Sequence, residues 1–184
     1  MFVKKIIGFI GPICSGKDTA GDYVSNLLNI KHLQISSPLI EEAKEMKIPL
    51  TRKDITKFGT ALAKVKGEDY LARILLEKIE KIGVISGMRQ LKQIHYLRDN
   101  SDLLLISVDC PVEIRFKRAK DRNKIVEAIK LQDFIKDELE ENSGENIQRV
   151  FECMKLADYK IKNDSNLESL HEQINNILRH NDLI

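Results

Sequence analysis

The chain has 184 residues, of which 42% are hydrophobic and 32% are charged, and its formal net charge is +2 at pH 7. This length favours one domain with a proper core, and the composition argues against a disordered chain or a membrane protein. The near-balanced charge gives no electrostatic case for binding nucleic acid. Cys14, Cys110 and Cys153 lie far apart without metal-ligand spacing, so we expect reduced thiols and a cytoplasmic location.

The N-terminal segment predicts a strand rather than a targeting sequence. Lys4 and Lys5 precede an apolar stretch, but that stretch is short and has no small-residue cleavage site. We therefore expect the first β-strand over residues 4–10. No segment approaches the ~20 apolar residues that a membrane-spanning helix requires.

Directly after this strand stands G-P-I-C-S-G-K-D-T, residues 11–19, which fits the phosphate-loop pattern G-x-x-x-x-G-K. Glycines permit a tight turn whose N–H groups point inward, and the helix that follows adds its positive end. Lys17 adds a mobile ammonium for the outer phosphates. The motif therefore predicts a binding loop for a nucleoside triphosphate, with contacts from Gly11, Ile13, Cys14, Ser15, Gly16, Lys17, Asp18 and Thr19.

Short apolar segments alternate with helical patterns along the rest of the chain, which predicts a parallel sheet built from βαβ units. The first helix is expected over 17–28, with a buried face formed by Ala20, Val24, Leu27 and Leu28. Further strands are expected at 32–35, 83–86, 103–108 and 159–162.

Two long insertions interrupt this alternation. Pro38, Pro49 and Gly67 divide the first into helices near 39–47, 51–65 and 68–81. The second lies between the fourth and fifth strands and is helical and rich in charge.

The positions of several arginines predict functional roles for them. Arg89 follows the third strand and should project into the crevice at the carboxyl ends of the strands. Arg52 opens a helix of the first insertion and could hold an acceptor phosphate through two hydrogen bonds. Arg115, Arg118 and Arg122 share one helix face, which predicts either a solvated basic stripe or lid arginines that stabilise a transferring phosphoryl group.

Four segments, in their order, resemble the nucleoside monophosphate kinase-like branch of P-loop kinases, especially deoxynucleoside monophosphate kinases, dephospho-CoA kinases and adenylate kinase-related proteins of archaea. They are S-G-K-D-T at 15–19, I-S-S-P-L at 35–39 with its continuation to 67, V-I-S-G-M-R at 84–89, and V-D-C-P at 108–111 followed by A-D-Y-K-I-K-N-D at 157–164. Together they span nearly the whole chain, and the first is highly specific on its own.

This resemblance implies a three-layer α/β fold in one P-loop kinase domain, residues 1–184. The sheet would have five parallel strands in the order 2-3-1-4-5, with an acceptor-binding insertion at about 37–81 and a lid insertion at about 111–156. The implied activity is transfer of the γ-phosphoryl group of ATP to a (deoxy)nucleoside monophosphate with Mg²⁺. The implied partner is a small-molecule nucleotide, with no nucleic acid and no membrane, for a monomer or small homo-oligomer.

The resemblance also assigns site residues. The catalytic residues would be Lys17, Arg89, Arg118 and Arg122. The acceptor would contact Ser36, Arg52 and Arg89. Besides the loop, ATP would contact Arg118 and Asn163, and Mg²⁺ would contact Asp18 and Thr19.

Ser86 departs from the family pattern, because relatives commonly place there an Asp that helps to organise Mg²⁺. Asp18 could compensate, since it directly follows Lys17 at the loop position that faces the metal. A non-catalytic ATP sensor stays open as an alternative, for which Ser86 would mark lost chemistry.

A hydroxyl acceptor, as in dephospho-CoA kinases, is a second alternative. Such an acceptor usually needs a carboxylate base, and the second strand ends at Ser36-Ser37 without one. This favours a phosphate acceptor, which is already anionic; Asp18 or Asp109 would have to serve as the base otherwise. The histidines do not cluster, and we expect structural or surface roles for them: His32, His95, His171 and His180.

Overall fold

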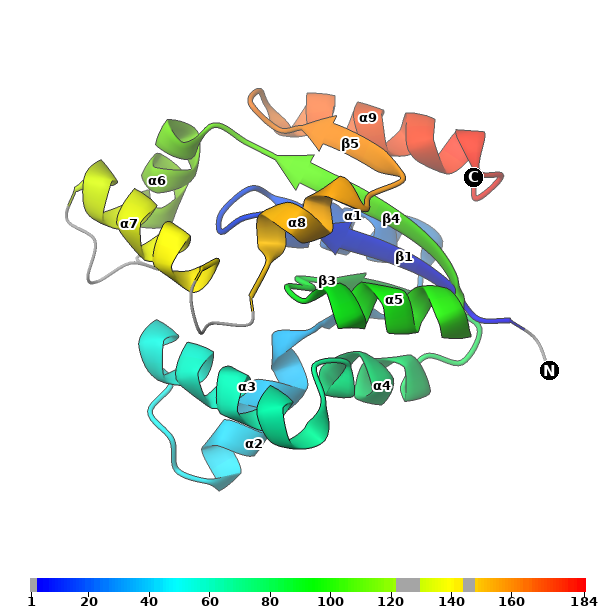
Figure 1. Ribbon diagram of the computed structural model, residues 1–184. Coiled ribbons are helices and arrows are strands. Elements are labelled where there is room, and N and C mark those ends of the chain that lie inside the picture. The colour runs from blue at the N-terminus through cyan, green and yellow to red at the C-terminus, as the bar shows by residue number, and fades with distance from the viewer. Residues whose placement is uncertain (1–2, 122–129, 144–147) are drawn as a thin grey trace.

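Five strands form one parallel sheet in the computed structural model, which describes residues 3–121, 130–143 and 148–184. The central strand β1 (Lys5–Ile10) pairs with β3 (Ile82–Ser86) and with β4 (Asp102–Asp109). On the outer sides, β2 (His32–Gln34) pairs with β3, and β5 (Tyr159–Lys162) pairs with β4. The order 2-3-1-4-5 confirms the expected topology, and all five carboxyl ends lie at one edge of the sheet (Figure 1).

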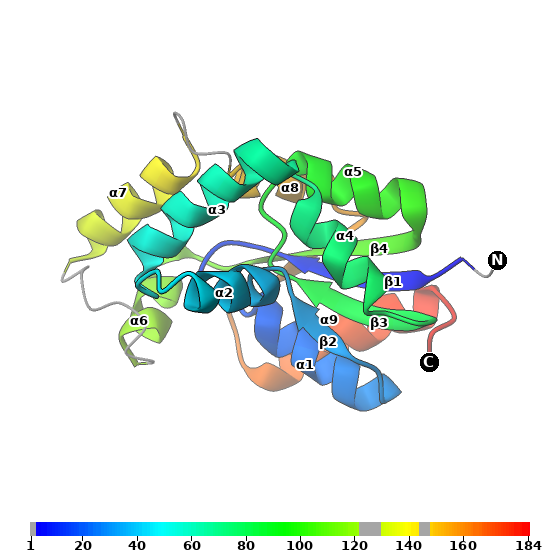
Figure 2. The same ribbon diagram turned by 90° about the horizontal axis from the view of Figure 1, so that it is seen from below.

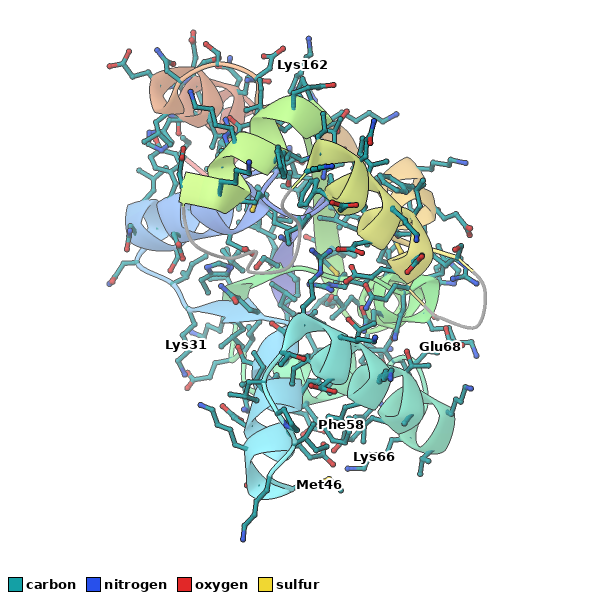
Figure 3. All side chains as sticks on the ribbon, turned by 90° about the vertical axis from the view of Figure 1, so that its left-hand side faces the viewer. Lys31, Met46, Phe58, Lys66, Glu68 and Lys162 are labelled. Atoms are coloured by element: carbon teal, nitrogen blue, oxygen red, sulfur yellow. The ribbon has the colours of Figure 1, made fainter. Side chains whose placement is uncertain are left out.

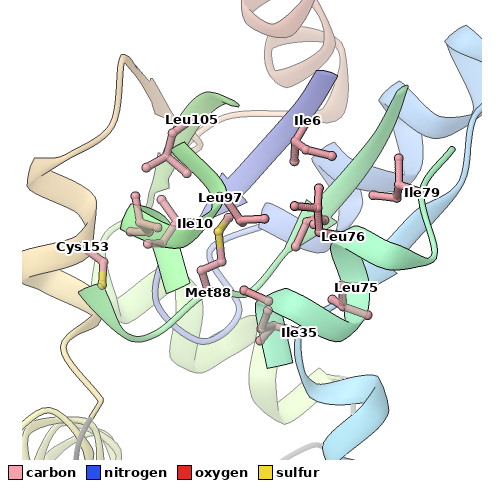
Figure 4. Close-up of a cluster of buried hydrophobic side chains, with 13 residues drawn as sticks. Ile6, Ile10, Ile35, Leu75, Leu76, Ile79, Met88, Leu97, Leu105 and Cys153 are labelled. Atoms are coloured by element: carbon pink, nitrogen blue, oxygen red, sulfur yellow. The ribbon is translucent and has the colours of Figure 1, made fainter. Parts of the chain in front are cut away.

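Side chains of β1 alternate between the two faces of the sheet, as a strand buried on both sides requires. Ile6 and Ile10 belong to the cluster on one face, which Figure 4 shows in close-up. Three helices cover this face: α4 (Tyr70–Glu77), α5 (Leu91–Asn100) and α8 (Val150–Lys155).

Ile7 and Phe9 point to the opposite face, against α1 (Lys17–Leu28) and α9 (Leu167–His180). Figure 2 shows α1 and α9 across the sheet from α5, so the molecule has the three expected layers. The bounds of α1 confirm the prediction, but Leu27, expected in the buried face, is 45% exposed.

The first insertion contains α2 (Ser36–Glu45) and α3 (Arg52–Lys66) before α4. Helix α2 begins three residues earlier than expected, because Pro38 lies in its first turn, where the missing N–H is not needed. In Figure 3 Met46 marks the outer end of this insertion, on the opposite side of the molecule from Lys162.

The second insertion contains α6 (Val112–Asp121) and α7 (Leu131–Glu141), followed by α8. Figure 2 shows α7 beside α3, and a side chain of α3 is hydrogen-bonded to one of α7, so the two insertions face each other beyond the carboxyl edge of the sheet. Within the described residues, no helix is both long and apolar enough to cross a membrane.

Candidate active site

The phosphate loop makes a tight turn between β1 and α1. Two of its residues have left-handed backbone conformations, Cys14 with a φ of 58° and Gly16 with a φ of 103°. A Cβ atom at Gly16 would also collide with the side chain of Asn163, so only glycine fits there. The Gly16 carbonyl accepts a hydrogen bond of 2.9 Å from the Ala20 N–H, which places the positive end of α1 at the loop. The motif therefore has the local structure that anion binding needs.

Lys17, the first residue of α1, reaches toward the end of β3. Only 11% of its side chain is exposed, and its Nζ lies 3.5 Å from Asp18 Oδ2. Burial lowers the pKa of Lys17 despite the nearby Asp18 carboxylate, and the charge of Arg89 acts in the same direction as burial. A bound anion would stabilise the charged form of this ammonium.

Lys17 lines a cavity that is called the phosphate cavity here. This cavity has about 750 Å³ of empty space, including its mouth. The strands β2 and β3, the phosphate loop and α1 all contribute to it. Its lining residues are Ile13, Cys14, Gly16, Lys17, Asp18, Thr19, Gln34, Ser36, Ser86, Gly87 and Arg89. The structure thus brings together most of the residues that the sequence analysis placed around donor phosphate and metal.

Ser86, at the end of β3, is connected to the phosphate loop by a hydrogen bond. Its hydroxyl donates to Asp18 Oδ1 at 2.9 Å, and its Oγ lies 2.9 Å from Nε2 of His32. The other ring nitrogen, Nδ1, lies 2.7 Å from Asp22 Oδ1. Burial opposes ionisation of Asp18, but the charge of Lys17 and the Ser86 hydrogen bond outweigh it and hold the pKa below its usual value. His32 is therefore linked to the site by hydrogen bonds, a link that the sequence alone did not indicate.

Arg89 lies where the phosphate cavity meets a second cavity. Its backbone is held on both sides: its N–H donates to Gln93 Oε1 at 2.9 Å, and its carbonyl accepts from the Arg149 N–H at 2.7 Å. Its guanidinium donates to Gln148 Oε1 at 3.2 Å. Burial is the main cause that lowers the pKa of Arg89. The side chain thus projects into the crevice beyond the strands.

The second cavity lies among α2, α3 and α4 and is called the insertion cavity here. It has about 620 Å³ of empty space including its opening, with mostly apolar walls and three amide side chains. The lining residues are Ile35, Ser36, Leu39, Ile55, Thr56, Gly59, Thr60, Leu62, Ala63, Gly67, Glu68, Tyr70, Leu71, Arg89, Gln90, Gln93 and Gln148.

Arg52, the first residue of α3, binds a carboxylate of the second insertion. Its Nε and Nη2 donate to the two carboxylate oxygens of Glu141 on α7, at 2.5 and 2.8 Å. Burial opposes the charge of Arg52, but the bond to Glu141 outweighs burial and raises the pKa. Both residues line a third hollow together with Lys17 and Arg89. Arg52 is therefore close to the phosphate site, and Glu141 occupies its guanidinium.

Arg115 is a buried structural residue rather than part of a solvated stripe. Its Nη1 and Nη2 donate to the carboxylate of Glu138 at 2.6 and 2.9 Å. Arg115 is 5% exposed and Glu138 is 7% exposed, so the pair fastens α6 to α7 inside the second insertion. Arg122, the last arginine of the predicted stripe, lies outside the described residues.

Arg118 contacts the backbone around the phosphate loop. It donates to the carbonyl of Ser15 at 3.4 Å and to the carbonyl of Asn163 at 3.2 Å. The Asn163 side chain donates to the same Ser15 carbonyl at 2.7 Å. Both residues expected near ATP therefore contact the phosphate loop, Arg118 from α6 and Asn163 from the position directly after β5.

The oxygen atoms of this site fit Mg²⁺. Asp18 and Thr19 both line the phosphate cavity and offer a carboxylate and a hydroxyl, which are the hard ligands that Mg²⁺ prefers. Over the described ranges, no group of three or more His, Cys, Asp and Glu side chains could hold a metal alone. Mg²⁺ is usually bound by one or two protein oxygens together with water and substrate phosphates.

The acidic residues of α7 were not predicted from the sequence. Glu138 and Glu141 stand three positions apart, which places them on one helix face. That spacing is a usable signal, but their arginine partners are on other helices and could not be assigned from it.

This fold and site define an α/β P-loop domain whose sheet order and helical insertions follow the kinase-like fold. Residues 7–147 match the family model described as the AAA domain, and the chain belongs to that family. A curated relative, the UPF0200/UPF0201 protein of Archaeoglobus fulgidus, is 28% identical over 183 residues. The match covers 95% of this chain and 55% of that protein, so this chain spans about half the length of that relative.

Solved structures show the same fold. Shikimate kinase from Aquifex aeolicus superposes with a TM-score of 0.57 at 21% identity, covering 97% of this chain and 98% of that one. A gluconokinase from Sinorhizobium meliloti gives a TM-score of 0.57 at 15% identity, covering 99% and 96%.

Proposed function

We propose that this chain is an ATP-dependent small-molecule kinase that transfers the γ-phosphoryl group to a (deoxy)nucleoside monophosphate. The position of Arg89 carries this proposal, because its side chain lines both the phosphate cavity and the insertion cavity. A donor phosphate beside Lys17 and an acceptor among α2, α3 and α4 would meet at this guanidinium. Phosphoryl transfer needs this arrangement, since its catalysis rests on positioning and charge neutralisation.

On the donor side, backbone N–H groups of residues 13–19 and the Lys17 ammonium would hold the β- and γ-phosphates. Mg²⁺, when bound by Asp18 and Thr19, would neutralise charge on these phosphates. The bond between the γ-phosphorus and its bridging oxygen breaks as the bond to the acceptor oxygen forms. No covalent enzyme intermediate is involved.

On the acceptor side, Ser36, Arg52 and Arg89 would contact the acceptor, with the two arginines holding its phosphate. Arg118 and Arg122 would neutralise the transferring group when the second insertion closes over it.

The insertion cavity favours a nucleotide as the acceptor. A nucleobase has flat apolar faces and a polar edge, and the cavity offers apolar walls such as Leu39 and Leu71 beside the Gln90 and Gln93 amides. Asp109, considered as a base for a hydroxyl acceptor, is exposed and lines a different surface depression. A phosphate acceptor needs no such base.

A hydroxyl acceptor is the second candidate, and the Asp18 carboxylate in the phosphate cavity favours it. The two structural neighbours are named for kinases of shikimate and gluconate, which are hydroxy acids. Against this candidate, Asp18 accepts a hydrogen bond from Ser86, and its lowered pKa makes it a weaker base.

The decisive experiment incubates the purified chain with MgATP and a panel of acceptors, and measures ADP release. The panel contains the nucleoside and deoxynucleoside monophosphates, dephospho-CoA, shikimate and gluconate. We expect turnover with one or a few monophosphates. Turnover only with a hydroxyl acceptor supports the second candidate, and ATP binding without any turnover supports a non-catalytic sensor.

A further inference from the structure

A continuous series of four hydrogen-bonded side chains runs from the surface of the molecule to the phosphate loop. Asp22 on α1 binds His32 on β2, His32 contacts Ser86 at the end of β3, and Ser86 donates to Asp18. Only Asp18 has a role in the proposed function. The other three residues come from three different elements, so the tertiary fold alone brings them together.

Gly21, in the middle of α1, leaves the space that the His32 ring occupies in this series. A Cβ atom there would lie 2.6 Å from two atoms of the His32 ring, which is too close for any side chain. Glycine is unfavourable inside a helix, so its presence here is explained by the space that the ring requires. With that space the His32 side chain is 7% exposed, whereas that of Asp22 is 68% exposed.

The available hydrogens determine which atom donates and which accepts in the hydrogen bonds on either side of Ser86. The ionised Asp18 carboxylate can only accept, so the single hydroxyl hydrogen of Ser86 points to Asp18. The Ser86 oxygen can then only accept from His32, so Nε2 must carry a hydrogen. At the other end of the ring, Nδ1 lies 2.7 Å from Asp22 Oδ1. The ring therefore lies between the Ser86 hydroxyl and the Asp22 carboxylate, with its Nε2–H directed to Ser86.

We propose that His32, held by Asp22, is a positioning residue that directs the Ser86 hydroxyl to Asp18 and thereby holds this carboxylate in place for MgATP. The inference rests on the proposed function in assuming that Asp18 meets Mg²⁺. It also explains Ser86, which stands where the resembling kinases commonly have Asp. Here the carboxylate comes from the phosphate loop, and position 86 supplies the hydrogen-bond donor that orients it.

The first test needs no nucleotide and is independent of the proposed function. Two-dimensional NMR that correlates the carbon-bound ring hydrogens with ¹⁵N reports whether each ring nitrogen carries a hydrogen. We expect Nε2 of His32 to carry a hydrogen, with the signal assigned by its loss in His32→Gln. A His32 ring with an unprotonated Nε2 overturns the proposal, because Ser86 would then donate to His32 and not to Asp18.

The second test measures ATP affinity by calorimetry with and without Mg²⁺. Residues that orient a metal ligand typically change metal affinity by about 10- to 100-fold when they are removed. We therefore expect His32→Phe and Ser86→Ala to weaken MgATP binding by about 10-fold or more, with little change in the affinity for metal-free ATP. His32→Gln keeps an N–H donor and should recover much of the loss, and His95→Gln, at an exposed histidine, is the control.

Equal weakening with and without Mg²⁺ overturns the proposal, because it would mean that the ring only supports the fold. If the wild-type chain binds no ATP, the proposed function fails, and the NMR result still decides whether the chain of hydrogen bonds exists.

Discussion

Arg52 and Glu141 stand 89 positions apart in the chain, and two hydrogen bonds of 2.5 and 2.8 Å join guanidinium and carboxylate. A carboxylate held in this way presents two oxygens to the arginine, as an acceptor phosphate would. Under the proposed function, an acceptor can bind Arg52 fully only when Glu141 moves away. Since Glu141 belongs to α7, acceptor binding and the position of the second insertion are coupled.

Replacing Glu141 with Gln should strengthen acceptor binding. The neutral amide competes less well for Arg52, and a partly exposed ion pair contributes up to about 1 kcal/mol, which corresponds to about fivefold. We expect the acceptor KM to fall by this factor in steady-state assays with the best acceptor of the panel. Asp133→Asn, at an exposed carboxylate of the same helix, is the matched control. A rise in KM would indicate that the pair assembles the site.

Replacing Arg52 with Ala should have the opposite effect. The acceptor loses a charged contact that it makes in both the ground state and the transition state, so KM should rise about tenfold or more while kcat changes less. The same assay measures both constants. An unchanged KM would place the acceptor elsewhere and leave Arg52 as a partner of Glu141 alone.

Replacing Arg118 with Ala should lower kcat more than it raises the acceptor KM. A lid arginine interacts mainly with the transition state, and losing one charged donor there lowers kcat by about 100- to 1,000-fold. Lys117→Ala, at the exposed neighbouring residue, should leave both constants near their wild-type values. If kcat survives in Arg118→Ala, this arginine serves only the carbonyls of Ser15 and Asn163.

Replacing Lys17 with Ala should abolish transfer. No other residue of the phosphate loop carries a positive charge, and we expect a loss of at least about 100-fold in kcat/KM because the ammonium stabilises the developing charge. Lys31→Ala is a suitable control, because Lys31 is exposed outside the site (Figure 3). Activity within a few-fold of wild type in Lys17→Ala would show that the donor phosphates bind elsewhere.

Replacing Glu138 with Ala should destabilise the protein by about 3–5 kcal/mol, because it leaves the buried Arg115 charge without a partner. The free energy of unfolding, measured by urea denaturation, provides the test. The double variant Arg115→Met with Glu138→Leu should recover most of the loss, since it removes both charges together. If the double variant is as unstable as the single one, the pair has a role beyond charge balance.

The strand–helix–strand pattern could be predicted because it depends on neighbouring residues. The bounds of α1 follow from the glycines and from the apolar spacing around Val24, and the sheet order came from the family resemblance. The start of α2 was wrong, since Pro38 was taken as a boundary although a first helical turn accepts it. Helices α5 and α9 were not delimited, because no motif marked them.

The candidate site was less predictable. Residues within a motif, such as Lys17 and Asp18, lie in the phosphate cavity because the local chain puts them there. The contacts of His32 with Ser86 and of Arg52 with Glu141 join positions 54 and 89 apart, and only the packing of separate elements creates them. No periodicity in the sequence reports such a pair.

The Asn163 side chain, which fills the space beside Gly16 and binds the Ser15 carbonyl, has a consequence for biosynthesis. The phosphate loop leaves the ribosome before β5 does, and the Asn163 side chain that binds the Ser15 carbonyl follows 148 positions later in the chain. Domains generally fold as units as the chain emerges. A nascent chain should therefore hold ATP only after β5 has joined the sheet, and ribosome-bound chains stalled before residue 159 are expected to emerge without that affinity.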